Sequence, residues 1–306
     1  MSNIINTTGI TVSQNSFGGV EVKGGDRSDI RSALDATGLN FKVEKRALYL
    51  GDRSKVPDAT AIVRTDTKAV LGVVGNKYRP VQNAEAFGVF QEAFDSGLLE
   101  IEVAGQLNEG RIIWVQARVV GDPLVVTGDD AVRPYVLLAN SHDGSVALRA
   151  GFTAIRLFCM NQMAAATRQG SLVSLKHTRN VNLDSLRSGI AAGQENLAKV
   201  VESARFLSAK KVPNDETLNQ FTRRSFNLDP EEPSRLDEKI QDLFETGIGA
   251  SYKPIRGSWW AAYNAVTEHL THHRGRTTDT RTKSLWFGDS AKVVGRSLEV
   301  ALEMAA

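Results

Sequence analysis

The chain has 306 residues, is 42% hydrophobic and 24% charged, and carries a formal net charge of +2. These values allow one large or two modest globular domains, and they exclude neither acidic nor basic partners. A single cysteine excludes an internal disulfide, and the sequence shows neither a membrane-spanning apolar run nor a signal peptide, so we expect a soluble, cytoplasmic protein.

The first part of the chain predicts short strands and two helices. Residues 1–28 are rich in Asn, Ser, Thr and Gly, which indicates a flexible N-terminal arm. One helix is expected over 28–37 with Ser28 as its N-cap, and another over 84–96 with Asn83 as its N-cap. Strand-like runs of alternating or β-branched residues lie at 41–50, 61–64 and 69–74.

Two β-hairpins are the clearest local predictions. LLEIEVAGQL and RIIWVQARVV both alternate in hydrophobicity, and Asn108-Glu109-Gly110 joins them with a glycine where φ should be positive. A second hairpin is expected from strands over 133–140 and 145–157. Its turn contains Asp143-Gly144, a dipeptide typical of hairpin turns between apolar runs.

The second part is predicted to be mostly helical. After Leu157 the apolar period lengthens, which predicts a helix over 158–169, and a strand is expected over 171–178. Further helices are expected at 183–209, 214–226, 234–244, 258–272 and 289–304. The fold class is therefore α+β: a small antiparallel β-sheet with hairpins and a backing helix in 29–180, then a mostly helical C-terminal half, 181–306, with a basic loop over 274–283.

Charge is distributed unevenly along the chain. From Arg149 onward 22 Lys/Arg stand against 17 Asp/Glu, whereas the first 148 residues hold 15 against 18. No acid occurs between Asp143 and Asp184. The cations of this stretch are Arg149, Arg156, Arg168, Lys176 and Arg179. A surface built from them would attract phosphate; the alternative is a buried hairpin and helix with charges at the ends.

Basic and aromatic residues also alternate further along. The stretch from Tyr252 to Arg296 holds eight Lys/Arg and three acids. Single-stranded nucleic acid is held by a basic groove with aromatic stacking faces. Candidates for such faces are Tyr78, Trp259, Trp260, Tyr263 and Trp286. The alternative is that Trp260 and Tyr263 belong to the core face of a helix.

Motifs for catalysis and cofactors are weak. His269 and His273 are one helical turn apart, but Leu270 stands where a helix-borne metalloprotease motif has its glutamate, so we expect no metal. Cys159 is expected to be a buried structural thiol. The sequence has neither a nucleotide-binding glycine loop nor a nucleophile elbow. We therefore expect no cofactor, no catalytic residue and no enzymatic activity.

A series of motifs runs through the chain in a specific order: VGNKYRPVQNAEAF, LLANSHDGSVAL, TAIRLFCMNQM, KHTRN and GSWWAAYNAVTEHLTHHRGR. Over residues 40–305 they resemble the phage/plasmid-like protein family, a family of unknown function carried by bacteriophages, prophages and plasmids. Its members look remotely similar to RecT/Red-beta and Rad-type single-strand annealing proteins. The resemblance implies a small sheet backed by a helix, a ring or filament of subunits, and single-stranded DNA in a basic groove.

These observations predict an ATP-independent protein that binds and anneals single-stranded DNA as a homo-oligomer. The six residues expected to line one groove are Lys77, Arg79, Arg156, Arg168, Lys176 and Arg179. The other predicted nucleic-acid contacts are Tyr78, Arg149, Asn161, His177, Lys253, Arg256, Trp259, Arg274, Arg276, Arg281 and Lys283. A phage exonuclease or a host single-strand-binding protein would be a further partner.

Two other classes of function remain open. One is a host-directed interaction or anti-defence protein, which would bind a host protein in place of DNA. The other is a nucleic-acid-modifying enzyme, whose metal-dependent activity would be lost on mutation of His269 or His273.

Overall fold

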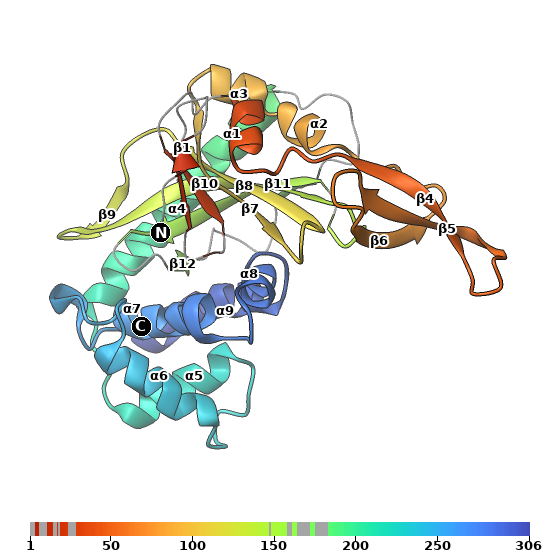
Figure 1. Cartoon of the computed structure of the whole chain (residues 1–306). Coiled ribbons are helices and arrows are strands. Elements are labelled where there is room, and N and C mark those ends of the chain that lie inside the picture. Colours follow the sequence, from red (N-terminus) through yellow and green to blue (C-terminus); the bar gives the residue numbers. More distant parts are fainter. Residues whose placement is uncertain are drawn as a thin grey trace. The chain divides into compact units, whose positions relative to one another are not determined.

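The structure is a computed structural model that describes residues 4–5, 11–14, 17, 19–23, 29–146, 148–157, 161–163, 172–174 and 183–306 (Figure 1). The chain divides into two compact units that are interleaved along the sequence. Unit 1 comprises the described residues of Met1–Val120, Val136–Gly151 and Leu172–Gly189. Unit 2 comprises those of Gly121–Tyr135, Phe152–Ser171 and Ile190–Ala306.

Ten of the described strands belong to one sheet. Its path is β1-β2-β3-β7-β8-β10-β11-β12, with β9 paired to β10 and β13 paired to β11. The strands are β1 (Ile4–Ile5), β2 (Thr11–Gln14), β3 (Val20–Lys23), β7 (Leu99–Leu107), β8 (Ile112–Val119), β9 (Leu124–Thr127), β10 (Asp130–Ser141), β11 (Arg149–Arg156), β12 (Gln162–Met163) and β13 (Leu172–Ser174). Strands β10 and β11 each contribute residues to both units.

The predicted hairpin of β7 and β8 is confirmed. The two strands pair antiparallel, and Asn108, Glu109 and Gly110 in the turn have φ angles of 52°, 60° and 92°. Such left-handed conformations favour Asn and Gly. Trp114 of β8 is fully buried, and a Cβ on Gly105 would lie 2.4 Å from its Cζ2 atom. Glycine is therefore required where β7 passes the indole.

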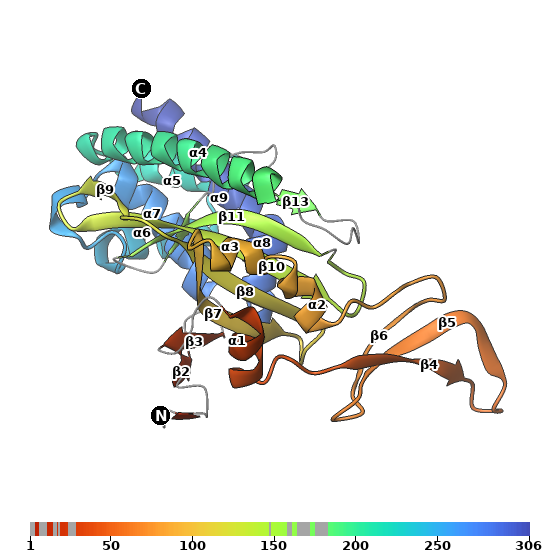
Figure 2. The same ribbon diagram turned by 90° about the horizontal axis from the view of Figure 1, so that it is seen from above.

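The three strand-like runs of the first part form a separate antiparallel sheet in unit 1. Its order is β4-β5-β6 (Figure 2). The strands are β4 (Val43–Tyr49), β5 (Lys55–Arg64) and β6 (Val70–Gly75). A Cβ on Gly72 would lie 2.7 Å from Cα of Asp143. The small sheet therefore packs closely against the turn after β10, which is the turn of the second predicted hairpin; β10 and β11 are neighbours in the sheet, as expected.

The helices of unit 1 differ from the prediction at their starts. Helix α1 (Ile30–Ala36) is capped by Asp29, whose side chain accepts from Arg31 N; Ser28 lies outside the described residues. The helix expected over 84–96 is two short helices, α2 (Asn83–Gly88) and α3 (Gln91–Asp95).

Asn83 is not the N-cap of α2 but its first residue, and its side chain is buried. The N-cap is Gln82, whose amide forms two hydrogen bonds with the backbone of Val43, at 3.0 and 2.9 Å. The long-range pairing with β4 replaces the local cap that the sequence indicated.

Unit 2 is mostly helical, which confirms the α+β class with a helical C-terminal half. Helix α4 (Leu183–Ala209), which begins in unit 1, has the predicted bounds. Asn214 caps α5 (Asp215–Ser225), and Ser234 forms a capping box with Asp237 in α6 (Arg235–Thr246). The remaining elements are η1 (Lys253–Ile255), α7 (Trp259–Glu268), η2 (His269–His273, a π-helical turn), α8 (Thr278–Phe287) and α9 (Asp289–Ala305).

Two predictions about this half are wrong in part. The expected basic loop at 274–283 contains the first six residues of α8, which is capped by the Thr277 side chain. The helix expected over 158–169 is contradicted at Gln162–Met163, which form β12; most of that range lies outside the described residues. Pairing with β11 gives these two residues a strand conformation that local periodicity does not indicate.

A polar cluster around His142 lies in the core of unit 1. His142 Nε2 is 2.9 Å from Asn83 Oδ1, Asn83 Nδ2 donates to Leu39 O (2.8 Å), and Asn140 Nδ2 is 3.2 Å from Asn83 Oδ1. The His142 side chain is fully buried. Burial lowers its pKa to about 4, and the charge of Arg64 acts in the same direction, whereas Asp143 opposes it.

The cluster predicts an acid-sensitive fold. The native state keeps His142 neutral down to about pH 4, whereas an ordinary histidine has a pKa of 6.5. Unfolding therefore takes up a proton between these two pH values. The contribution of His142 to the free energy of unfolding is fully present above pH 6.5 and is lost as the pH falls towards about 4. One such group changes the free energy of unfolding by about 1.4 kcal/mol per pH unit.

We expect His142→Gln to reduce this dependence, measured by urea unfolding at about pH 7 and about pH 5. The wild type should lose more stability between the two pH values than the variant does. His269, whose pKa is also lowered to about 4, leaves some dependence in both proteins. An equal loss in both would show that His142 takes no part.

Candidate nucleic-acid interface

In unit 2 the loop before α7 lies against the C-terminal end of α4. Trp259 N donates to Lys210 O (2.9 Å), and Lys211 Nζ donates to Arg256 O (2.5 Å). These bonds hold the two lysines that follow α4 beside η1 and its exposed neighbour Arg256, although more than 40 residues separate the two segments in the chain.

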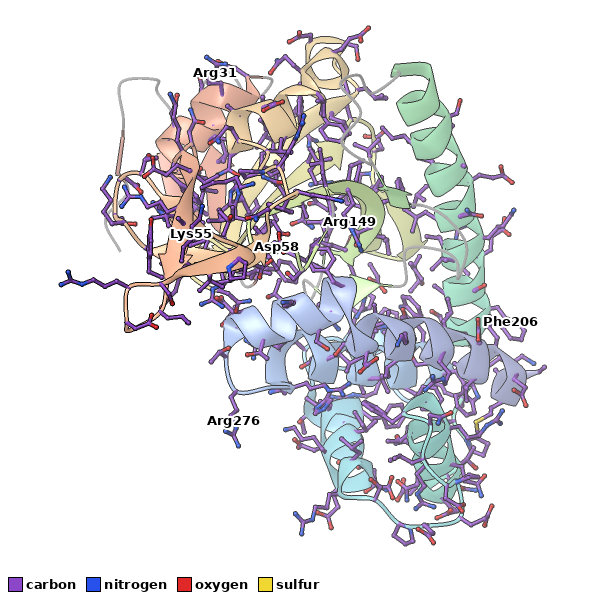
Figure 3. All side chains as sticks on the ribbon, turned by 90° about the vertical axis from the view of Figure 1, so that its right-hand side faces the viewer. Arg31, Lys55, Asp58, Arg149, Phe206 and Arg276 are labelled. Atoms are coloured by element: carbon purple, nitrogen blue, oxygen red, sulfur yellow. The ribbon has the colours of Figure 1, made fainter. Side chains whose placement is uncertain are left out.

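Together the two segments form a basic surface with an aromatic ring. We call it the α4–η1 surface; its residues are Arg205, Phe206, Lys210, Lys211, Lys253 and Arg256. All six are exposed. Phe206 is 41% exposed on α4 (Figure 3). Within the described part of the chain, none of the five cations forms an ion pair, so their charge is not neutralised there.

Contacts within unit 2 orient several of these side chains. Arg205 Nη2 donates to Val125 O in β9 (2.6 Å), and Lys210 Nζ lies 5.5 Å from the centre of the Phe206 ring. The exposed carboxylates nearest in the chain are Glu202, one turn before Phe206 on α4, and Asp215 and Glu216 in the first turn of α5. The surface therefore presents cations around a partly exposed ring, a combination suited to phosphates and bases.

Sequence reasoning found only part of this surface. Lys253 and Arg256 were predicted contacts, and both are exposed. Arg205, Phe206, Lys210 and Lys211 were missed. The available signal was the pair of lysines directly after a long helix, where cations are favoured by the helix dipole, but nothing local places that pair beside η1.

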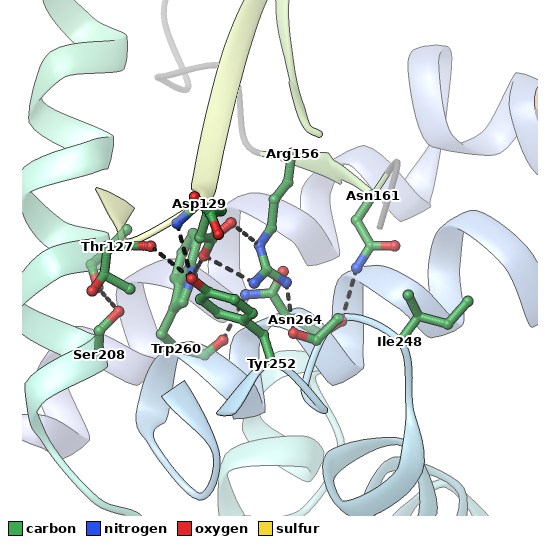
Figure 4. Close-up of polar contacts among 12 residues, drawn as sticks. Thr127, Asp129, Arg156, Asn161, Ser208, Ile248, Tyr252, Trp260 and Asn264 are labelled. Atoms are coloured by element: carbon green, nitrogen blue, oxygen red, sulfur yellow. Dashed lines mark hydrogen bonds and ion pairs between the residues drawn. The ribbon is translucent and has the colours of Figure 1, made fainter. Parts of the chain in front are cut away.

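The structure gives Arg156 a different role from the predicted phosphate contact. Arg156 and Asp130 are both fully buried and form a two-point ion pair, with Nε–Oδ1 and Nη2–Oδ2 distances of 2.5 and 2.9 Å (Figure 4). Arg156 Nη1 donates to Gly249 O (2.6 Å), and Trp260 Nε1 donates to Asp130 Oδ2 (3.1 Å). Every side of the guanidinium is occupied by protein, so Arg156 is a core residue.

The buried network extends to α7. Glu268 is 3% exposed, and its carboxylate accepts from Ile248 N (3.0 Å) and Gly249 N (2.7 Å). A Cβ on Gly249 would lie 2.9 Å from Asn161 Nδ2 and 3.1 Å from Glu268 Oε2. Gly249 therefore joins the two buried charged groups, through its carbonyl to Arg156 and through its amide to Glu268.

Asn161 and Trp259 were predicted nucleic-acid contacts, and both are buried. Asn161 Nδ2 donates to Asn264 O (3.3 Å), and its Oδ1 is 3.1 Å from His272 Nε2. Trp259 packs edge-on against Phe221. Both residues are part of the core, and the prediction of direct contact is corrected for them.

The other aromatic candidates of this half are also buried. Trp260 stacks on Tyr263 at a centroid distance of 5.1 Å and an angle of 16°, and Trp286 is 8% exposed. The alternative of a helical core face is the correct one for Trp260 and Tyr263.

The remaining predicted contacts are divided between the units. In unit 1, Lys77 and Arg79 are exposed, Arg149 is half-buried, and the half-buried Tyr78 donates its hydroxyl to Ser141 O (2.8 Å). Arg168, Lys176, His177 and Arg179 lie outside the described residues. Of the six residues expected in one groove, the structure therefore describes three, and one of these is in the core.

The last four predicted contacts lie around α8 in unit 2. Arg276 is exposed, Lys283 is half-buried, and Arg274 lies with its guanidinium carbon 5.9 Å from the centre of the Phe226 ring. Arg281 Nη2 donates to Thr278 Oγ1 (3.3 Å). They are a second basic region of unit 2.

No cluster of three or more His, Cys, Asp or Glu side chains in the described residues could hold a metal ion. Among the described helices, none has the length and apolar character needed to cross a membrane.

The buried pair predicts a large loss of stability in Arg156→Ala. Removal of one partner leaves Asp130 charged and uncompensated in the core, which costs about 3–5 kcal/mol. Urea unfolding measures the difference. Arg276→Ala is the matched control, because Arg276 is exposed, and it should change stability by less than about 0.5 kcal/mol. A loss no larger than that in Arg156→Ala would contradict the buried pair.

Comparison with known proteins gives a family and nothing more specific. The family model described as a domain of unknown function, DUF932, matches residues 70–286, which include the Asp130–Arg156 pair and the whole α4–η1 surface. No curated protein and no solved structure matches the chain. Since the matched segment covers more than two thirds of the 306 residues, the chain belongs to the DUF932 family.

Proposed function

We propose that the protein binds single-stranded DNA through the α4–η1 surface. The observation that carries this proposal is the exposure, on the same surface as the partly exposed ring of Phe206, of five cations that form no ion pair within the described part of the chain. Lys and Arg side chains neutralise backbone phosphates, and release of the counterions from DNA drives the binding. A ring among them offers a base a stacking face.

The exposed ring favours single strands over duplex. Bases in a duplex are already stacked on both faces, whereas those of a single strand are free to stack on a side chain. Arginine and lysine contacts to phosphate carry no sequence information. Binding at this surface should therefore be largely independent of sequence and strongly dependent on salt.

Annealing is the further activity that this proposal includes. It requires two complementary strands to be held close together, which a homo-oligomer would achieve by placing several α4–η1 surfaces side by side. Weak contacts in each subunit would then add up through multivalency. In this respect the protein would act like RecT/Red-beta proteins of phages and mobile elements, with an exonuclease or a single-strand-binding protein as a partner.

A host-directed interaction protein is the second candidate. The observation that favours it is the set of exposed apolar side chains on or beside the small sheet of unit 1: Tyr49, Leu50, Val70 and Val73, each at least 54% exposed. Exposed apolar groups of this kind are typical of protein-binding surfaces. If the protein does not bind DNA even at low salt, the small sheet becomes the candidate binding surface, with a host protein as its partner.

The first prediction for DNA binding concerns charge. We expect Lys210→Gln/Lys211→Gln to bind a labelled single-stranded oligonucleotide more weakly, measured by fluorescence anisotropy over a series of salt concentrations. Loss of two phosphate contacts should reduce the slope of log K against log salt by about 1.4.

The matched control removes the same charge elsewhere. Lys68→Gln/Lys199→Gln changes two exposed lysines outside the α4–η1 surface, of which Lys199 lies on α4 and pairs with Glu195. This control should bind like the wild type. Equal weakening in both double variants would mean that binding depends on net charge and not on this surface.

The second prediction concerns stacking. Phe206→Ala should lose about 1–3 kcal/mol of binding free energy with no change in the salt slope, because the ring carries no charge. Phe206→Trp, which keeps an aromatic face, should bind at least as well as the wild type. If Phe206→Ala binds normally while the lysine variant is weak, the surface binds backbone alone.

A further inference from the structure

Three basic side chains in one segment of unit 2 carry buried nitrogen atoms without a partner. They are His269 Nδ1 in η2, Arg274 Nη1 directly after it, and Arg281 Nε in α8, and none has a hydrogen-bond partner in the described part of the chain. Buried polar groups in folded proteins are nearly always hydrogen-bonded, and exceptions point to an ion or ligand. All three nitrogens belong to groups that can donate hydrogen bonds.

Two of these side chains lie against the same aromatic ring. The His269 ring meets the Phe226 ring edge-on at a centroid distance of 6.0 Å, and the Arg274 guanidinium lies 5.9 Å from the centre of the same ring. Arg274 N also donates to His269 O (2.8 Å), the bond that closes the π-helical turn. Such π-helical turns often occur at functional sites because they displace side chains from the regular helical positions.

The surroundings of this pair are positively charged. The pKa of His269 is lowered to about 4 by burial and by the charges of His273, Arg274 and Lys239. Two carboxylates of this region are paired with lysines: Asp242 is 3.6 Å from Lys239, and Asp289 is 2.9 Å from Lys292. Asp289 also senses the charge of Arg274, although no ion pair joins them. A bound anion would therefore balance the positive charge around His269.

We propose that His269, His273, Arg274 and Lys239 form a binding site for a phosphate group, separate from the α4–η1 surface. The guanidinium fork of arginine suits the oxygens of phosphate, and the imidazole and ammonium groups add further donors around a tetrahedral ligand. The phosphate is either a free phosphomonoester or the terminal phosphate of a nucleic acid. The proposal does not depend on DNA binding elsewhere, because inorganic phosphate alone tests it.

The test is thermal unfolding of the whole chain in sodium phosphate and in sodium chloride of equal ionic strength at neutral pH. Binding to the native state should raise the melting temperature of the wild type by at least about 2 °C in phosphate. Arg274→Gln should lose this rise. Arg276→Gln removes an exposed arginine two residues away, which projects from the loop before α8 (Figure 3), and should keep it.

A second measurement needs no variant. In a phosphate titration followed by histidine NMR signals, the His269 ring should shift saturably and its pKa should rise, while the buried His142 ring in unit 1 should not move. An oligonucleotide with a 5′-phosphate should compete with phosphate for these shifts if a terminal phosphate is the ligand, whereas its dephosphorylated form should not.

The proposal is overturned if phosphate gives no rise over chloride, if Arg274→Gln keeps the full rise, or if the His269 signals stay unchanged. Failure of both oligonucleotides to compete, with the response to inorganic phosphate intact, identifies the ligand as a free phosphomonoester.

Discussion

Unit 2 depends on the contacts of one buried carboxylate, that of Asp130. It accepts two bonds from Arg156 and one from the indole of Trp260, and Arg156 in turn reaches the carbonyl of Gly249. Strands β10 and β11, the loop after α6 and helix α7 therefore meet at one neutralised pair of charges. A buried pair of this kind contributes little net stability. Removal of either partner, however, leaves the other as an unpaired charge in the core, which strongly destabilises the fold. The pair thus specifies one arrangement of these elements.

Local features account for what sequence alone predicted well. Asn214 and Ser234 begin helices through bonds within their own first turns, and Gly110 suits its hairpin turn whatever surrounds it. The misplaced cap at Asn83 shows the limit. Its neighbour Gln82 is the N-cap of α2 because the Gln82 side-chain amide forms hydrogen bonds with the backbone of Val43, about 40 residues away. No local sequence pattern contains that partner.

Charge was the least reliable guide to the candidate site. An acid-free stretch predicted an exposed Arg156, yet its acid comes from the preceding strand, 26 residues earlier. The α4–η1 surface, in contrast, joins two segments, of which only the one with Lys253 and Arg256 is conspicuous in the sequence. Electrostatic surfaces depend on neighbours in space, and only the packing of η1 against the end of α4 reveals this one.

The interleaving of the two units has a consequence for how the chain folds during synthesis. Asp130 and Arg156 leave the ribosome long before Gly249 and Trp260, which complete their hydrogen bonds. Domains that form from continuous segments can fold as they emerge, but this one cannot close its core until most of the chain has been made. For about 100 residues of translation the Asp130–Arg156 pair lacks the partners that Gly249 and Trp260 supply, an interval in which a chaperone or a neighbouring chain has access to these polar groups.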